Sequence, residues 1–267
     1  MYLFRQWWLP EGKPKAVIII VHGYGEHSGR YSSVVEYFNT HNYACYTFDL
    51  RGHGRSEGPR TLIKSFDEYI MDVEDILSDV QKSKPGLPIF LLGHSLGGAI
   101  STLFTITRKP VINGLILSGA YLMLDENVSL LKVRLAFIIS TIFPSLPVEK
   151  RLNNHLLSRD PEVVKQYEKD PLIYHGSMKA REGVEIIRAI KSIQSQMETI
   201  ALPLLILHGT DDKIANVKGS KEIYSRANSQ DKVLKLYEGF YHEILNEPEK
   251  SIVMTDIINW LDAHIHI

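Results

Sequence analysis

This sequence contains very little cysteine, with Cys45 the only one among 267 residues. A single thiol cannot form an internal disulfide or supply the several cysteine ligands of a structural zinc site. The His-Glu-x-x-His run of zinc hydrolases is also missing. The fold must therefore rest on its apolar core, and both disulfide scaffolds and these two kinds of zinc site are excluded.

An excess of one charge is missing as well, because 30 Lys and Arg residues face 31 Asp and Glu residues, giving a formal net charge of −1. Nucleic-acid-binding domains usually carry a marked basic excess. We therefore expect no nucleic-acid partner.

Long apolar runs are absent too. The most apolar window, residues 130–143, includes Lys132 and Arg134, and a membrane-spanning helix needs about 20 apolar residues. The first ten residues show neither the apolar centre nor the small-residue cleavage site of a secretion signal. We therefore expect a cytoplasmic protein, with peripheral membrane association as an open addition.

Short apolar runs recur along the chain, and most lack polar alternation, which is typical of parallel strands buried on both faces. Amphipathic helical patterns, such as residues 66–82 and 251–264, lie between several of them. This alternation predicts an α/β fold with a mostly parallel, doubly wound sheet. The expected strands are residues 16–21, 44–48, 88–92, 114–118, 203–208 and 233–237.

One interval is much longer than a crossover between two strands requires. Residues 119–202 contain helix-like stretches separated by prolines. Ligands bind at the carboxyl edge of open α/β sheets, where such an insertion would lie. We therefore predict a catalytic core of residues 1–118 and 203–267, covered at that edge by a helical cap, or lid, of residues 119–202.

A serine lies on a sharp predicted turn. Ser95 is the centre of a Gly-x-Ser-x-Gly sequence that directly follows the strand at 88–92 and directly precedes a helical stretch at 99–107. This is the context of a nucleophile elbow, in which Gly93 and Gly97 leave room for a strained backbone. The alternative is a chance match in an ordinary turn.

A nucleophilic serine needs a histidine base and a carboxylate that orients the base. In this architecture the chain order is Ser, then Asp or Glu, then His. His242 lies in the loop after the last expected strand, and Asp211 and Asp212 follow the strand at 203–208. The residues therefore predict His242 as the base and leave the two aspartates as alternatives.

A tetrahedral oxyanion needs two backbone donors, one after the serine and one from the loop after an early strand. We assign the N–H groups of Leu96 and Tyr24 to this role. The glycines near Tyr24 also resemble a dinucleotide-binding loop, but their spacing is G-x-G-x-x-x-G, and that interpretation explains neither Ser95 nor His242.

These motifs together resemble the monoacylglycerol lipase branch of the α/β-hydrolase superfamily, serine hydrolases with a cap over the sheet. Residues 22–31 read HGYGEHSGRY, and residues 93–98 read GHSLGG. The matching sequence continues through the interval 164–172 to YEGFYH at 237–242. The resemblance covers nearly the whole chain.

The resemblance implies specific roles for residues at matching positions. It favours Asp212 over Asp211 as the triad acid and implies that Glu26, Arg30, His94 and Tyr167 bind the glycerol head group. The alternatives are purely structural roles: a surface ion pair for Glu26 and Arg30, and packing of the lid for Tyr167.

The function implied is hydrolysis of a monoacylglycerol through an acyl-enzyme, with no metal or organic cofactor. The alternatives are a lysophospholipase or general carboxylesterase with the same triad, or a binding protein that has lost catalysis.

The cap carries an apolar helical stretch at residues 130–143. It packs onto the domain below or forms a rim that meets lipid aggregates, as in the family's cap. Its apolar side chains are Leu131, Leu135, Ile138, Ile139, Ile142 and Phe143.

Overall fold

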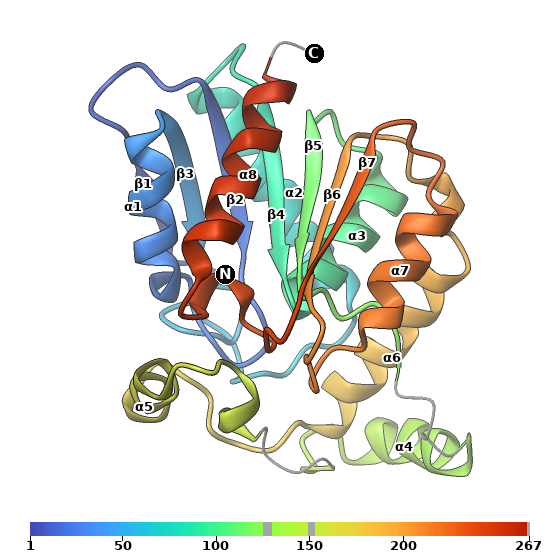
Figure 1. The fold of residues 1–267 in the computed structure, drawn as a ribbon. Coiled ribbons are helices and arrows are strands. Elements are labelled where there is room, and N and C mark those ends of the chain that lie inside the picture. Colours follow the sequence, from blue (N-terminus) through green and yellow to red (C-terminus); the bar gives the residue numbers. More distant parts are fainter. Residues whose placement is uncertain (125–129, 149–152, 266–267) are drawn as a thin grey trace.

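The structure is a computed structural model that describes residues 1–124, 130–148 and 153–265. The strands of this part of the chain form one sheet in the order β1-β3-β2-β4-β5-β6-β7 (Figure 1). β1 is antiparallel to β3, and the other neighbours are parallel. The strands are β1 (Arg5–Trp8), β2 (Ala16–Val21), β3 (Tyr43–Phe48), β4 (Ile89–His94), β5 (Gly114–Ser118), β6 (Leu204–Gly209) and β7 (Lys232–Tyr237).

The central strands are apolar because both faces of the sheet are covered. All six residues of β2 are buried, and they alternate between two cores. Val17, Ile19 and Val21 pack on one side, with the helices α2, α3, α6 and α7. The other side is covered by α1 and α8 (Figure 1). These helices are α1 (Ser32–Thr40), α2 (Asp67–Ser83), α3 (Leu96–Arg108), α6 (Ala180–Gln194), α7 (Val217–Arg226) and α8 (Lys250–His264).

This architecture confirms the predicted fold class, and each of the six expected strands is present. β1 was not expected. Its sequence, RQWW, has neither an apolar run nor apolar alternation, and β1 is a half-buried strand at the edge of the sheet. α1 and α7 were not predicted either, since both are short, at nine and ten residues.

The interval 119–202 contains α4 (Leu130–Ile142), α5 (Pro161–Lys169) and α6. α4 and α5 lie beneath the carboxyl ends of the strands in Figure 1. In contrast, Ile186, Ile190 and Ile193 of α6 are buried in the same core as α3. The division into a core and a cap at residues 119–202 stays a prediction, and α6 shows that this interval also covers the sheet.

Main-chain hydrogen bonds attach the segment around α5 to two loops at the carboxyl edge of the sheet. The N–H of Tyr174 donates to the carbonyl of Gly25 at 2.7 Å, in the loop after β2. The N–H of Glu243, in the loop after β7, donates to the carbonyl of Leu157 at 2.7 Å. The segment is therefore tied to two loops of the sheet's carboxyl edge.

α4 exposes much of its apolar surface. Ile138 is 60% exposed, Ile142 63% and Phe143 60%. Leu135 is also exposed and Ile139 is half-buried, whereas the side chain of Leu131 lies outside the described residues. Packing onto the domain below thus accounts for one side of the helix only. None of the helices in the described ranges is long and apolar enough to cross a membrane.

Candidate active site

Ser95 lies between β4 and α3, in a backbone conformation that is rare outside glycine. Its φ is 52° and its ψ is −116°, which is strained for a residue with a side chain. A Cβ at Gly93 would lie 2.4 Å from the carbonyl oxygen of Gly97, and one at Gly97 would lie 2.1 Å from that of Val21. The two glycines are therefore required by the turn, as the sequence predicted.

The fold brings Ser95, His242 and Asp212 together from three different loops. His242 Nε2 lies 2.9 Å from Ser95 Oγ, and His242 Nδ1 lies 2.7 Å from Asp212 Oδ2. Asp212 is buried, whereas Asp211 is exposed. Of the two alternatives, Asp212 is the carboxylate that contacts the histidine.

The carboxylate of Asp212 is held by three further contacts besides His242. Its Oδ1 accepts from the N–H groups of Ile214 at 2.8 Å and Ala215 at 2.9 Å. His208 Nε2 lies 3.0 Å from Asp212 Oδ2 and 3.1 Å from the carbonyl oxygen of Ala215, while Ser220 Oγ lies 2.7 Å from His208 Nδ1. No motif in the sequence marks His208 for this role. Burial raises the pKa of Asp212, but His242 and His208 outweigh it and hold that pKa well below its usual range.

The charge of Asp212 acts on the histidine in turn. Burial disfavours the imidazolium, but the attraction of Asp212 and its hydrogen bond dominate, so the pKa of His242 lies above the ordinary 6.5. Neutral His242, with its proton on Nδ1, can accept a proton from Ser95 at Nε2. The arrangement can therefore activate the serine hydroxyl as a nucleophile.

The two predicted oxyanion donors lie beside Ser95. Leu96 is the first residue of α3, and the first N–H groups of a helix have no acceptor within it. The loop after β2 comes close, since a Cβ at Gly23 would lie 3.2 Å from Ser95 Cβ. Tyr24, next in this loop, and Leu96 both line the cavity above the serine. Their role as oxyanion donors stays a prediction.

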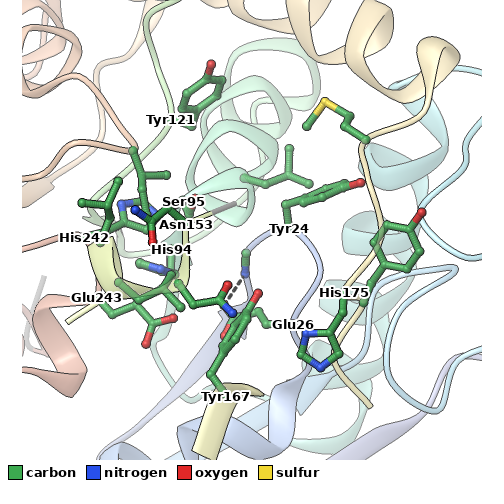
Figure 2. A pocket seen from close by; sticks show the side chains of 18 of the residues that line it. Tyr24, Glu26, His94, Ser95, Tyr121, Asn153, Tyr167, His175, His242 and Glu243 are labelled. Atoms are coloured by element: carbon green, nitrogen blue, oxygen red, sulfur yellow. Dashed lines mark hydrogen bonds between the residues drawn. The ribbon is translucent and has the colours of Figure 1, made fainter. Parts of the chain in front are cut away.

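Ser95 opens into a cavity of about 650 Å³, within the range of small-molecule sites. Its walls come from the sheet's loops and from the interval 119–202. In Figure 2, Glu26, Tyr167 and Glu243 lie together below Ser95, and Tyr121 lies above it. Apolar side chains complete the lining: Leu96, Leu156, Leu157, Met178, Ile186 and Ile214.

A buried ion cluster forms one end of this cavity. Glu26 and Glu243 are each 4% exposed, and both pair with Arg30. The guanidinium lies 4.8 Å from the ring centre of Tyr167. The predicted residues Glu26, His94 and Tyr167 line the cavity, but Arg30 does not. The ion pair is therefore buried, and the alternative of a surface pair is wrong.

Glu243 is a lining residue that the sequence analysis missed. Arg30 donates to both of its carboxylate oxygens at 2.7 Å. The two residues are 213 positions apart, so no local pattern links them. The only signal in the sequence was a carboxylate directly after His242.

Metal binding can be assessed for the residues that the structure describes. Among them, no three His, Cys, Asp or Glu side chains are grouped so as to hold a metal ion.

Comparisons with known proteins fit this geometry. Residues 12–249 match the family model described as "Serine aminopeptidase, S33". A monoacylglycerol lipase of Mycolicibacterium smegmatis is 35% identical over 97% of this chain and 92% of its own length. The human monoglyceride lipase is 35% identical over 97% of this chain and 86% of its own.

A solved structure agrees with both fold and sequence. The monoacylglycerol lipase of Paleococcus ferrophilus superposes with a TM-score of 0.88 at 33% identity, covering 99% of this chain and 100% of that one. The chain therefore belongs to the monoacylglycerol lipase family of the α/β-hydrolase superfamily.

Proposed function

We propose that this chain hydrolyses the ester bond of monoacylglycerols to a fatty acid and glycerol. The observation that carries the proposal is the hydrogen-bonded Ser95–His242–Asp212 triad at a cavity with apolar walls and a buried polar end. An acyl chain fits the apolar walls, and a polyol fits the polar end. Relatives that are named monoacylglycerol lipases support the same substrate.

The first half of the reaction forms the acyl-enzyme. Ser95 Oγ attacks the ester carbonyl carbon as His242 Nε2 takes the hydroxyl proton. The carbonyl oxygen becomes an oxyanion, which the N–H groups of Tyr24 and Leu96 stabilise. As the tetrahedral intermediate collapses, the bond to the glycerol oxygen breaks and His242 donates its proton to that oxygen. Asp212 stabilises the imidazolium throughout.

The second half returns the enzyme to its starting state. Water attacks the acyl-enzyme carbonyl while His242 accepts one of its protons. A second oxyanion forms and collapses, the bond to Ser95 Oγ breaks, and His242 returns the proton to the serine. The fatty acid leaves, and no external reductant, oxidant or cofactor enters the balance.

A substrate panel tests the proposal against its nearest alternatives. We expect kcat/KM for 2-oleoylglycerol to exceed that for lysophosphatidylcholine by at least about tenfold, equivalent to ~1.4 kcal/mol. A clear preference for lysophosphatidylcholine would contradict the assignment and favour a lysophospholipase. Similar values for short p-nitrophenyl esters and 2-oleoylglycerol would favour a general carboxylesterase.

We also propose that α4 brings the enzyme into contact with lipid aggregates. The exposed apolar face around Ile138, Ile142 and Phe143 supports this idea, because exposed apolar patches of this kind mark interaction surfaces. An interfacial helix buries its apolar face at the boundary of the headgroups and acyl chains. Peripheral association of a cytoplasmic enzyme with a lipid aggregate would bring its cavity to the insoluble substrate.

The double variant Ile138→Ser/Ile142→Ser tests this contact. We expect about tenfold or greater loss of binding to phosphatidylcholine vesicles, since a buried Ile side chain contributes about 1.5–3 kcal/mol. Hydrolysis of soluble p-nitrophenyl butyrate should stay at the wild-type level. Val111→Ser/Ile252→Ser is the matched control, since both side chains are exposed elsewhere. Equal vesicle binding by the two double variants would contradict the proposal.

A further inference from the structure

Glu243 lies in the site next to His242 but is not a member of the Ser95–His242–Asp212 triad. It directly follows His242, is buried, and lines the cavity. Its carboxylate accepts two hydrogen bonds from Arg30 and one, at 2.9 Å, from the side-chain amide of Asn246. It is thus rigidly held beside the base without taking part in the triad.

Glu26 mirrors this arrangement on the other side of the guanidinium. Arg30 donates to its Oε2 at 2.5 Å, while the Gly23 N–H at 2.6 Å and the Tyr31 hydroxyl at 2.8 Å donate to its Oε1. A Cβ at Gly23 would lie 3.0 Å from Glu26 Oε1 and 3.2 Å from Ser95 Cβ. This carboxylate therefore lies close to the reacting serine.

The cluster carries one net negative charge at neutral pH. Burial raises the pKa of Glu26, but Arg30 dominates and lowers it to about 2. The pKa of Glu243 is likewise lowered, because Arg30 outweighs its burial. Burial and the nearby His242 lower the pKa of His94 to about 4, so His94 is neutral and does not compensate.

That charge faces the ligand. Glu26 and Glu243 line the cavity (Figure 2), whereas Arg30 is not part of the lining and packs against the ring of Tyr167. Two other charged residues of the lining, Glu168 and Lys213, have opposite signs. The excess charge of the described lining therefore rests with the two carboxylates.

The hydrogen bonds made by the two carboxylates point to the chemistry that they accept. A carboxylate offers about four lone-pair sites, and each of these carboxylates receives three described hydrogen bonds. About one acceptor site per carboxylate is left. Two acceptors suit the two free hydroxyls of a glycerol monoester, and an anionic head group would meet like charge in a desolvated site.

We infer that Glu243, together with Glu26, is a specificity-determining residue that rejects esters with an anionic head group and admits neutral polyol esters. The inference rests on the proposed function. Its matched substrate pair is 1-oleoylglycerol and 1-oleoyl-lysophosphatidic acid, which share the acyl chain and the scissile ester and differ by one phosphate.

The test compares kcat/KM for this pair in the wild type, Glu243→Gln, Glu243→Asp and Glu249→Gln, above the pH where His242 protonates. We expect the wild type to prefer the glycerol ester by about 100-fold or more, and Glu243→Gln to reduce that ratio at least about tenfold. The ratio in Glu243→Asp should stay close to the wild-type value because the charge is kept. Glu249, which pairs with Arg159 outside the cavity, is the neutralisation control.

The outcomes distinguish failure of the specificity inference from failure of the proposed function. A wild-type ratio near one, an unchanged ratio in Glu243→Gln, or equal relaxation in Glu243→Gln and Glu243→Asp would overturn the inference. Hydrolysis of p-nitrophenyl butyrate, which has no polyol, shows whether each variant retains a working triad. If Glu243→Gln no longer hydrolyses p-nitrophenyl butyrate, the inference is tested by the substrate ratios of the wild type and of Glu243→Asp. Failure of the wild type on every ester would instead refute the proposed function.

Discussion

Ser95→Ala is expected to lower ester hydrolysis by a factor on the order of 10⁶, because it removes the nucleophile and leaves only binding and the oxyanion donors. The change should not unfold the chain. Ser95 has a φ of 52°, and alanine meets the same backbone strain as serine. Activity and the midpoint of thermal unfolding, measured together, separate lost chemistry from lost structure.

Covalent labelling gives an independent readout of the same substitution. A fluorophosphonate probe reacts with an activated serine, so it should label the wild type and fail to label Ser95→Ala. Ser225→Ala is the control, since the Ser225 hydroxyl is exposed and bonds only to the carbonyl of Glu222 among its described contacts. An unlabelled wild type would favour a non-catalytic binding protein, and labelled Ser95→Ala would place the nucleophile elsewhere.

Asp212→Asn is expected to lower kcat by about 10⁴, because the wrong imidazole tautomer is then favoured. The carboxylate accepts the hydrogen bond from His242 Nδ1–H and so leaves Nε2 free to accept from Ser95. An amide in its place can present its NH₂ group to Nδ1, which puts the imidazole proton on Nε2. Asp211→Asn is the matched control, and an equal loss in both variants would contradict the assignment.

The same pair of variants tests the direction of the histidine pKa. The pKa of His242 is raised above 6.5, so wild-type kcat/KM should fall as the pH is lowered through that raised value. Below it the imidazolium cannot accept a proton. Removing the charge of Asp212 should move this limb to lower pH, and removing that of Asp211 should leave it in place. The pKa values of His94, about 4, and Glu26, about 2, lie too low to produce the limb.

The features that were predictable from the sequence are those that a short segment determines by itself. The elbow needs small residues two positions from the serine, and Gly93 and Gly97 satisfy a constraint within five residues. The central strands were predictable because burial on both faces excludes polar residues. The edge strand β1 is half-buried and escapes that constraint.

The choice between Asp211 and Asp212, and the position of Glu243, depended on the path of loops in space. Neighbouring residues such as the two aspartates differ only in which way the turn presents each side chain. The pairing of Arg30 with Glu243 joins loops after β2 and β7 that are distant in sequence. Composition and spacing do not encode such contacts, so the net charge of the polar end could not be predicted.

The attachment of the segment around α5 has a consequence for how this enzyme can change over time. Two of its ties to the sheet's loops, Tyr174 to Gly25 and Glu243 to Leu157, use peptide groups and no side chains. A substitution at a lining position of this segment alters the shape offered to a ligand while these two links persist. Natural variants can therefore change their substrate preference while the segment around α5 stays attached next to Ser95.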